Sequence, residues 1–180
     1  MLFFLILMLS AKGQNLNPDT KKSHQTFGTE LDLLPYISNG YYLSAWYGTG
    51  RFRIRGVLTK TTIPGFMLKD GFKDNKLTVY AGIVDYFFND NFKGAWVGAG
   101  FEAWESEIRN ENSSGTATYN NKILTLGGGY VWKFFDNFYL NPWAALHYIV
   151  GGETEIRLGN SVHKPGVLTP EVSIKLGWHF

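Results

Sequence analysis

Apolar and polar residues alternate along most of the chain from residue 26 onward, and this period of two is typical of β-strands with two unlike faces. The C-terminus shows it most clearly, because Val172, Ile174, Leu176, Trp178 and Phe180 share one face. No segment has a convincing helical period. The pattern predicts about eight strands, at residues 26–34, 41–48, 51–60, 77–88, 93–105, 122–135, 138–150 and 171–180.

The links between these segments alternate in length. Good turn formers make the short links, at residues 48–50, 89–91 and 136–137. The other links are longer and polar, at residues 64–75, 106–121 and 151–167, with 35–40 as a short exception. Eight antiparallel strands can close a sheet and remove its edges. Short turns at one rim and long loops at the other are the layout of an outer-membrane barrel.

Aromatic residues gather at the predicted short-turn rim. The turns at residues 87–92 and 134–138 resemble each other, since each encloses a polar tip with phenylalanines. We expect a girdle at the membrane–water interface, made of Phe87, Phe88, Phe92, Phe134, Phe138, Trp178 and Phe180. The alternative is a soluble sheet in which the aromatics of the hairpin tips pack on one another.

The charged residues bear on which face lies inside. A soluble barrel of the lipocalin kind fills its interior with apolar side chains, whereas a membrane barrel turns its charges inward. Strand pairing places Arg53 level with Asp85, and closure of the barrel places Lys175 near Glu30. We expect ion pairs in a plugged lumen without an open pore, from Arg51, Arg53, Arg55, Asp85, Glu30, Lys175 and Glu102.

The N-terminus differs from the rest of the chain. An apolar run at residues 2–9 is too short to span a membrane and precedes a small-x-small pattern at 11–13. We expect a signal peptide over residues 1–13, a polar segment over 14–25 and the barrel over 26–180; a buried N-terminal strand or helix is the alternative.

Composition excludes several classes of protein. The 180 residues are 44% hydrophobic and 17% aromatic, which excludes intrinsic disorder. No cysteine is present, so disulfides and thiolate metal sites are excluded. A net charge of +2 gives no electrostatic case for nucleic acid as a partner.

Residues 30–36, 40–42 and 46–48, with the C-terminal strand and the rhythm of short turns and long loops, carry a resemblance to a known family. The chain resembles the small eight-stranded outer-membrane proteins of the OmpA/OmpX type and is similar to uncharacterised barrels of Bacteroidota. The resemblance covers residues 26–180. It implies an all-β, closed, antiparallel, up-and-down transmembrane barrel in the outer membrane of a Gram-negative cell. Outer-membrane lipid is then a partner, as is the barrel-assembly machinery acting through the C-terminal strand.

The sequence offers little catalytic chemistry. The four histidines lie at no metal-ligand spacing, and we expect neither a metal nor another cofactor. Some small membrane barrels modify lipid A with a His and a Ser; the candidates here are His147 with a loop serine, or His163 beside Ser161.

Loops on a rigid scaffold are the more plausible functional surface. Candidate loop-binding residues are Arg109, Tyr119, Arg157 and His163. The sequence therefore predicts a barrel with a structural, adhesive or surface-binding role and an unknown extracellular ligand. A secreted lipocalin-like carrier of a small apolar ligand is the main alternative, and a lipid A acyl-modifying enzyme is the third.

Overall fold

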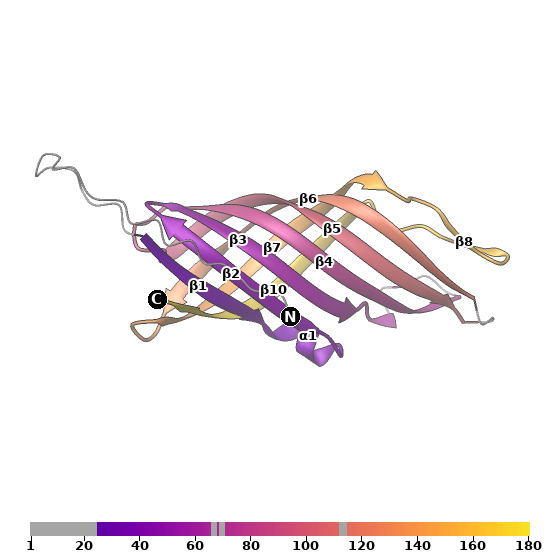
Figure 1. Ribbon diagram of the computed structural model, residues 1–180, viewed down its shortest axis with the longest axis horizontal. Coiled ribbons are helices and arrows are strands. Elements are labelled where there is room, and N and C mark those ends of the chain that lie inside the picture. The colour runs from indigo at the N-terminus through magenta and orange to yellow at the C-terminus, as the bar shows by residue number, and fades with distance from the viewer. Residues whose placement is uncertain (1–24, 66–67, 69–70, 112–114) are drawn as a thin grey trace, which may run out of the picture.

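The computed structural model describes residues 25–65, 68, 71–111 and 115–180. The expected signal peptide and all but the last residue of the expected polar segment lie outside these residues. Eight strands close into one barrel in the order β1-β10-β7-β6-β5-β4-β3-β2, and every neighbouring pair is antiparallel. The predicted fold class is confirmed (Figure 1).

The strand bounds follow the predicted alternation, with extensions toward one rim. The barrel strands are β1 Gln25–Asp32, β2 Tyr41–Thr49, β3 Phe52–Thr62, β4 Phe72–Phe87, β5 Gly94–Asn110, β6 Thr116–Lys133, β7 Phe138–Gly152 and β10 Leu168–His179. Exposed and buried residues alternate without exception along β2, as expected for a strand between lipid and lumen.

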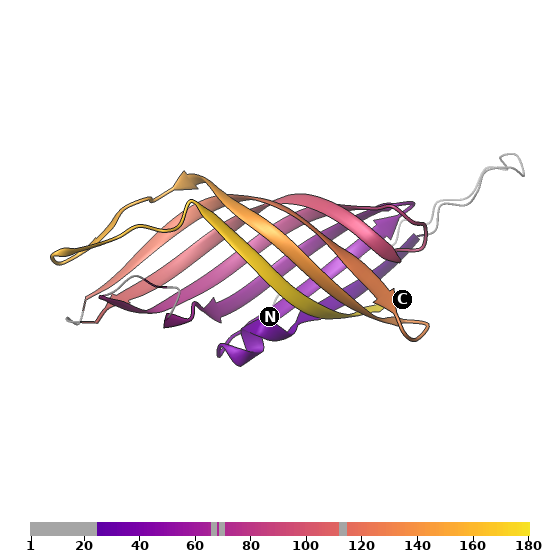
Figure 2. The ribbon, with the colours of Figure 1, turned by 180° about the vertical axis from the view of Figure 1, so that it is seen from behind.

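The two rims differ in construction. Short turns join β2 to β3, β4 to β5 and β6 to β7, as predicted. At the opposite rim, β4 to β7 extend well past β1 to β3, so this wall of the barrel stands higher (Figures 1 and 2). The polar segment 106–121 was expected to be a loop, but only residues 111–115 separate β5 from β6. The pairing of Arg109 with Thr116 continues the ladder, because backbone hydrogen bonds do not require apolar side chains.

A short helix, α1 Leu33–Ile37, replaces the last two residues of the predicted first strand and part of the next link. The Asp32 carboxylate accepts a hydrogen bond from the backbone N–H of Leu34 at 3.0 Å and caps this turn. Among the described residues, no helix is long and apolar enough to cross a membrane. Within the segment 153–167, two strands form a separate hairpin, β8 Ile156–Leu158 and β9 Ser161–His163.

The outside of the barrel is apolar and the inside is charged. Ile54, Leu126 and Ile174 are about half exposed on the outer face. Arg53, Asp85 and Lys175 lie inside with 1% exposure or less. This is the reverse of a lipocalin-like barrel, and it fits a barrel surrounded by lipid.

Two apolar clusters fill the ends of the interior. Near the short-turn rim, the turn-end cluster consists of Trp46, Phe87, Phe92, Trp96, Val131, Tyr139, Trp143 and Ala145. Near the loop rim, the loop-end cluster consists of Phe72, Ile108, Tyr119, Ile156 and Leu158, and it anchors the β8–β9 hairpin.

The turn-end cluster corrects two predicted interface aromatics. Phe87 has no exposed surface, and Phe92 is also buried. Phe87 shares the inner face with Asp85, two residues earlier on β4. Phe92 has a left-handed backbone conformation (φ 50°), and its side chain points inward. Its ring occupies the space that a Cβ at position 48 would need, so only glycine fits at position 48.

Candidate functional site

A cluster of four charged side chains crosses the lumen above the turn-end cluster. Arg53 and Arg55 both donate from Nε to Asp85 Oδ2 at 2.7 Å, and Arg55 Nη2 donates to Asp85 Oδ1 at 2.9 Å. Arg53 Nη1 donates to Glu30 Oε1 at 2.9 Å, while Arg55 Nη1 lies 3.5 Å from Glu30 Oε2. Two positive and two negative groups therefore balance within a site closed to solvent.

Aromatic rings enclose the two guanidinium groups. The Arg53 Cζ lies 5.0 Å from the centre of the Phe87 ring and 5.2 Å from that of Trp96. The Arg55 Cζ lies 5.0 Å from Trp96 and 5.6 Å from Trp143. Such contacts are worth about 0.5–2 kcal/mol each, and more when desolvated. The cations are thus held by ring faces as well as by carboxylates.

Neutral donors also contact one oxygen of Glu30. Tyr139 and Asn141, both on β7, donate to Glu30 Oε1 at 3.0 Å. Trp46 in turn donates to the Tyr139 hydroxyl, and Trp96 donates to the Asn141 side-chain oxygen, each at 2.9 Å. The network links β1, β2, β3, β4, β5 and β7, so it holds opposite walls of the barrel together.

The predicted lumen residues are placed as follows. Arg53 and Asp85 are cross-strand partners and form the predicted ion pair. Lys175 lies in the lumen near Glu30, as predicted, and the two side chains interact electrostatically, although its register partner on β1 is Asp32. The prediction of Arg51 as a lumen residue is wrong, because Arg51 lies exposed in the β2–β3 turn.

Arg51 points away from the lumen because it belongs to the turn before β3 begins at Phe52. Its Nε donates to the exposed Asp90 of the next turn at 3.0 Å. An exposed pair of this kind contributes about 0–1 kcal/mol.

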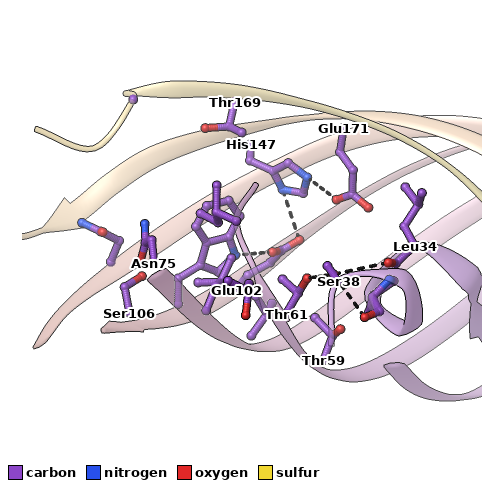
Figure 3. A pocket seen from close by; sticks show the side chains of 18 of the residues that line it. Leu34, Ser38, Thr59, Thr61, Asn75, Glu102, Ser106, His147, Thr169 and Glu171 are labelled. Atoms are coloured by element: carbon purple, nitrogen blue, oxygen red, sulfur yellow. Dashed lines mark hydrogen bonds and ion pairs between the residues drawn. The ribbon is translucent and has the colours of Figure 1, made fainter. Parts of the chain in front are cut away.

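A second polar group, the His147 cluster, lies higher in the lumen. His147 Nε2 is 2.9 Å from Glu171 Oε2, and His147 Nδ1 is 2.9 Å from Thr125 Oγ1. Glu102 accepts from Thr125 at 2.7 Å and from Trp104 Nε1 at 2.6 Å. Glu102, predicted to form lumen ion pairs, therefore does face His147, at 3.4 Å (Figure 3).

A cavity of about 900 Å³ occupies the upper lumen next to the His147 cluster. In Figure 3, Leu34 of α1 and Ser38, which caps the end of α1, lie toward one end of the view, and Asn75 and Ser106 lie at the other. Lys175 and Tyr42 line the cavity as well, although both side chains are almost completely buried. The volume falls within the roughly 300–1,000 Å³ of sites that bind small molecules.

Two predicted loop-binding residues are not available at the surface. Tyr119 and His163 are buried in and beside the loop-end cluster, with the Tyr119 hydroxyl 3.4 Å from His163 Nε2. Tyr119 belongs to the extended β6, and the alternation of side chains along this strand directs it inward. Arg109 and Arg157 are exposed, on β5 and β8.

The remaining predicted interface aromatics surround the short-turn rim. Phe88, Phe134 and Phe180 are exposed, and Trp178 is 39% exposed. Phe138 lies between them, with its ring centre 4.3 Å from that of Trp178. Their place on the rim suits an aromatic girdle.

The sequence does not identify the neutral residues that contact the buried charges. Tyr139, Asn141 and Trp96 lie on the inner faces of β7 and β5, yet their residue types alone do not indicate which charge they contact. Within residues 25–65, 68, 71–111 and 115–180, no three His, Asp or Glu side chains are grouped to hold a metal ion.

Comparisons with known proteins agree with this geometry. Neisserial surface protein A (NspA) shares 15% identity with the chain at a TM-score of 0.54, over 87% of this chain and 94% of NspA. The N-terminal β-barrel domain of Pseudomonas aeruginosa OprF shares 16% identity at a TM-score of 0.56, over 87% of this chain and 96% of that domain. No protein-family model matches the chain, and no curated protein does.

The closed ring of eight strands, the apolar outer band and the charged interior define the class. The chain has the fold of the eight-stranded outer-membrane β-barrels.

Proposed function

We propose that this barrel is closed to solutes and acts at the cell surface through its loop rim, in a structural or surface-binding role. The observation that carries the first part is the cluster of Arg53, Arg55, Glu30 and Asp85, whose side chains are at most 1% exposed. Below it, the turn-end cluster fills the narrow interior that eight strands enclose. The charged side chains pack directly on the rings of this cluster, and together they leave no path for a hydrated solute.

Liposome swelling tests the closed lumen. Proteoliposomes containing the barrel should swell in arabinose no faster than protein-free liposomes. Swelling at a porin-like rate would refute the proposal. Replacing the buried pair by Arg53→Ser with Asp85→Ser should raise the rate, whereas the matched exposed pair, Arg51→Ser with Asp90→Ser, should leave it unchanged.

The surface role is supported by the shape of the loop rim. The high wall of β4 to β7 carries the β8–β9 hairpin, which is anchored by Ile156 and Leu158 in the loop-end cluster. Exposed charges cover this region; Lys164 Nζ lies 2.5 Å from Glu155, and this contact lowers the pKa of the Glu155 carboxyl. An anchored, charged projection suits recognition of an external partner.

A hairpin exchange tests the surface role. Replacing residues 154–164 by a short Gly-Ser turn should leave barrel assembly intact, as judged by heat-modifiable mobility in SDS gels. Retention of expressing cells on immobilised surface material should fall to the level of cells without the barrel. Unchanged retention, together with normal assembly, would exclude the hairpin as the binding element.

A further inference from the structure

The cavity above the charge cluster has an apolar wall where a membrane barrel normally presents polar residues to its lumen. Leu77, Val79, Ala81 and Ile83 alternate along the inner face of β4, and Val57 of β3 lies beside them. Apolar surface in contact with water raises the free energy in proportion to its area. The wall therefore favours an apolar occupant over water.

The floor of the cavity holds a cation that makes no direct ion pair. Lys175 is 1% exposed, and its Nζ lies 3.7 Å from the centre of the Trp143 ring and 5.0 Å from that of Tyr42. Among the described residues, it forms no ion pair or hydrogen bond, in contrast to Arg53 and Arg55. A buried ammonium that donates no hydrogen bond is costly, even with carboxylates nearby.

A second donor next to Lys175 is also free. The Tyr42 hydroxyl is buried and has no hydrogen-bond partner in the described part of the chain. An ammonium and a hydroxyl that line the same cavity form a donor set for an anionic oxygen.

The carboxylates of the cavity are already engaged. Asp32 accepts hydrogen bonds from the Ser173 hydroxyl and from the backbone of Leu34. Glu102 and Glu171 both face His147. Glu30, Asp32 and Glu171 act on Lys175 through space, but none of them lies within ion-pair distance of its ammonium. Lys175 can therefore still make a direct contact with an anionic ligand.

The cavity also has a route to the lipid-facing surface. β1 pairs with β10 only from Gly28 to Asp32, so β10 residues 168–174 have no strand partner on that side, and α1 lies there instead. Leu34 and Ile37 of α1 and Val172 of β10 line the cavity, yet they are 48%, 81% and 72% exposed. These residues connect the inside of the cavity to the outside of the barrel.

We propose that the cavity binds a single-chain amphiphile with a carboxylate head, namely a long-chain carboxylate that enters between α1 and β10. The carboxylate contacts Lys175 and Tyr42, and the chain lies along the wall of β3 and β4. An eight-stranded barrel has room for one small ligand, which favours a single chain over a two-chain lipid. This ligand site goes beyond the closed lumen and the surface role, since it needs neither.

Competition binding tests the site with the full barrel in phosphatidylcholine vesicles. Parinarate, a fluorescent long-chain carboxylate, is bound first and then displaced by palmitate or by its methyl ester, which lacks the charge. Palmitate should displace parinarate from the wild-type barrel about tenfold more effectively than the ester. Equal displacement would overturn the proposed head-group contact.

Single variants distinguish binding in the cavity from general electrostatic attraction of palmitate to the barrel surface. Lys175→Met should weaken palmitate binding about tenfold and leave ester binding within about twofold. The matched control Lys60→Met, at an exposed position on β3, should change neither. A loss of palmitate binding in Lys60→Met equal to that in Lys175→Met would overturn the assignment.

Two further variants keep the proposal testable if Lys175→Met does not fold. Tyr42→Phe removes only a hydroxyl and should weaken palmitate binding about threefold to tenfold, with the ester unaffected. Ala81→Phe fills the cavity and should abolish binding of both molecules, provided that heat-modifiable mobility shows a folded barrel. Full binding by folded Ala81→Phe would place the ligand elsewhere and refute the proposal.

Discussion

The replacement Asp85→Asn probes the charge cluster most directly. Asp85 has no exposed surface, and it accepts three hydrogen bonds from Arg53 and Arg55, at 2.7, 2.7 and 2.9 Å. Asparagine keeps the shape of the side chain but removes its charge. Two buried guanidinium groups then face the single carboxylate of Glu30.

The expected cost follows from burial. Removing one partner of a buried ion pair costs about 3–5 kcal/mol, because the remaining charge is left without compensation. Each hydrogen bond to a charged group contributes about 1.5–3 kcal/mol. The asparagine oxygen can retain at most the two hydrogen bonds made to Oδ2, and both then lose the charge of their acceptor. We therefore expect the free energy of unfolding to fall by about 3–5 kcal/mol. Urea unfolding in phosphatidylcholine vesicles, followed by tryptophan fluorescence, measures it, since Trp96 and Trp143 lie against the guanidinium groups.

Two controls make the result decisive. Asp90→Asn breaks the exposed pair with Arg51 and should cost no more than about 1 kcal/mol. Arg53→Met combined with Asp85→Asn restores charge balance, so the double variant should be more stable than the sum of the single effects by about 0.5–3 kcal/mol. Equal losses in Asp85→Asn and Asp90→Asn, or strict additivity in the double variant, would refute the buried network.

Two other replacements test the packing of the barrel interior, and a third tests the role of the last strand in assembly. Gly177→Ala would place a Cβ within 2.0 Å of the Tyr139 ring, so we expect a loss of about 1–3 kcal/mol in urea unfolding; no loss would mean that Tyr139 lies elsewhere. Phe87→Ala should cost about 3–5 kcal/mol because its ring is buried, whereas its exposed neighbour Phe88→Ala should cost about 0.5 kcal/mol. Similar values for the two would contradict the inward placement of Phe87. If the assembly machinery recognises the last strand, Phe180→Ala should reduce the amount of folded barrel recovered from cells. Refolding of the purified variant into detergent should then be largely unchanged. An equal deficit in both would assign Phe180 a packing role only.

Much of the barrel could be predicted from the period of two in the sequence. Lipid outside and a narrow lumen inside require apolar and polar side chains at alternate positions, so each strand shows this alternation in its sequence. The Arg53 and Asp85 contact was predictable because the short links before β3 and after β4 lie at the same rim, so a residue near the start of β3 and one near the end of β4 stand at the same height. The alternation along β4 also predicts that Phe87 points inward, because Phe87 lies two residues after Asp85. Its position beside a polar turn suggests a place at the rim instead.

Other features depend on contacts between segments far apart in the chain. The position of Lys175 depends on the register in which β10 closes on β1, and no short turn joins these two strands. Tyr119 and His163 resemble loop residues in the sequence, because polar neighbours surround them. They are buried only because the β8–β9 hairpin folds onto the extended wall of the barrel.

The central claim is that the apolar face of each strand contacts lipid and the charged face is enclosed. The chain has no cysteine, so single cysteines can carry spin labels without background. Labels at Ile54, Leu126 and Ile174 should be accessible to oxygen dissolved in the bilayer and shielded from a water-soluble nickel chelate, and labels at Ser44 and Thr125 should be shielded from bilayer oxygen. If oxygen reached the labels at Ser44 and Thr125 while those at Ile54, Leu126 and Ile174 were shielded, the barrel would be inside out relative to this account.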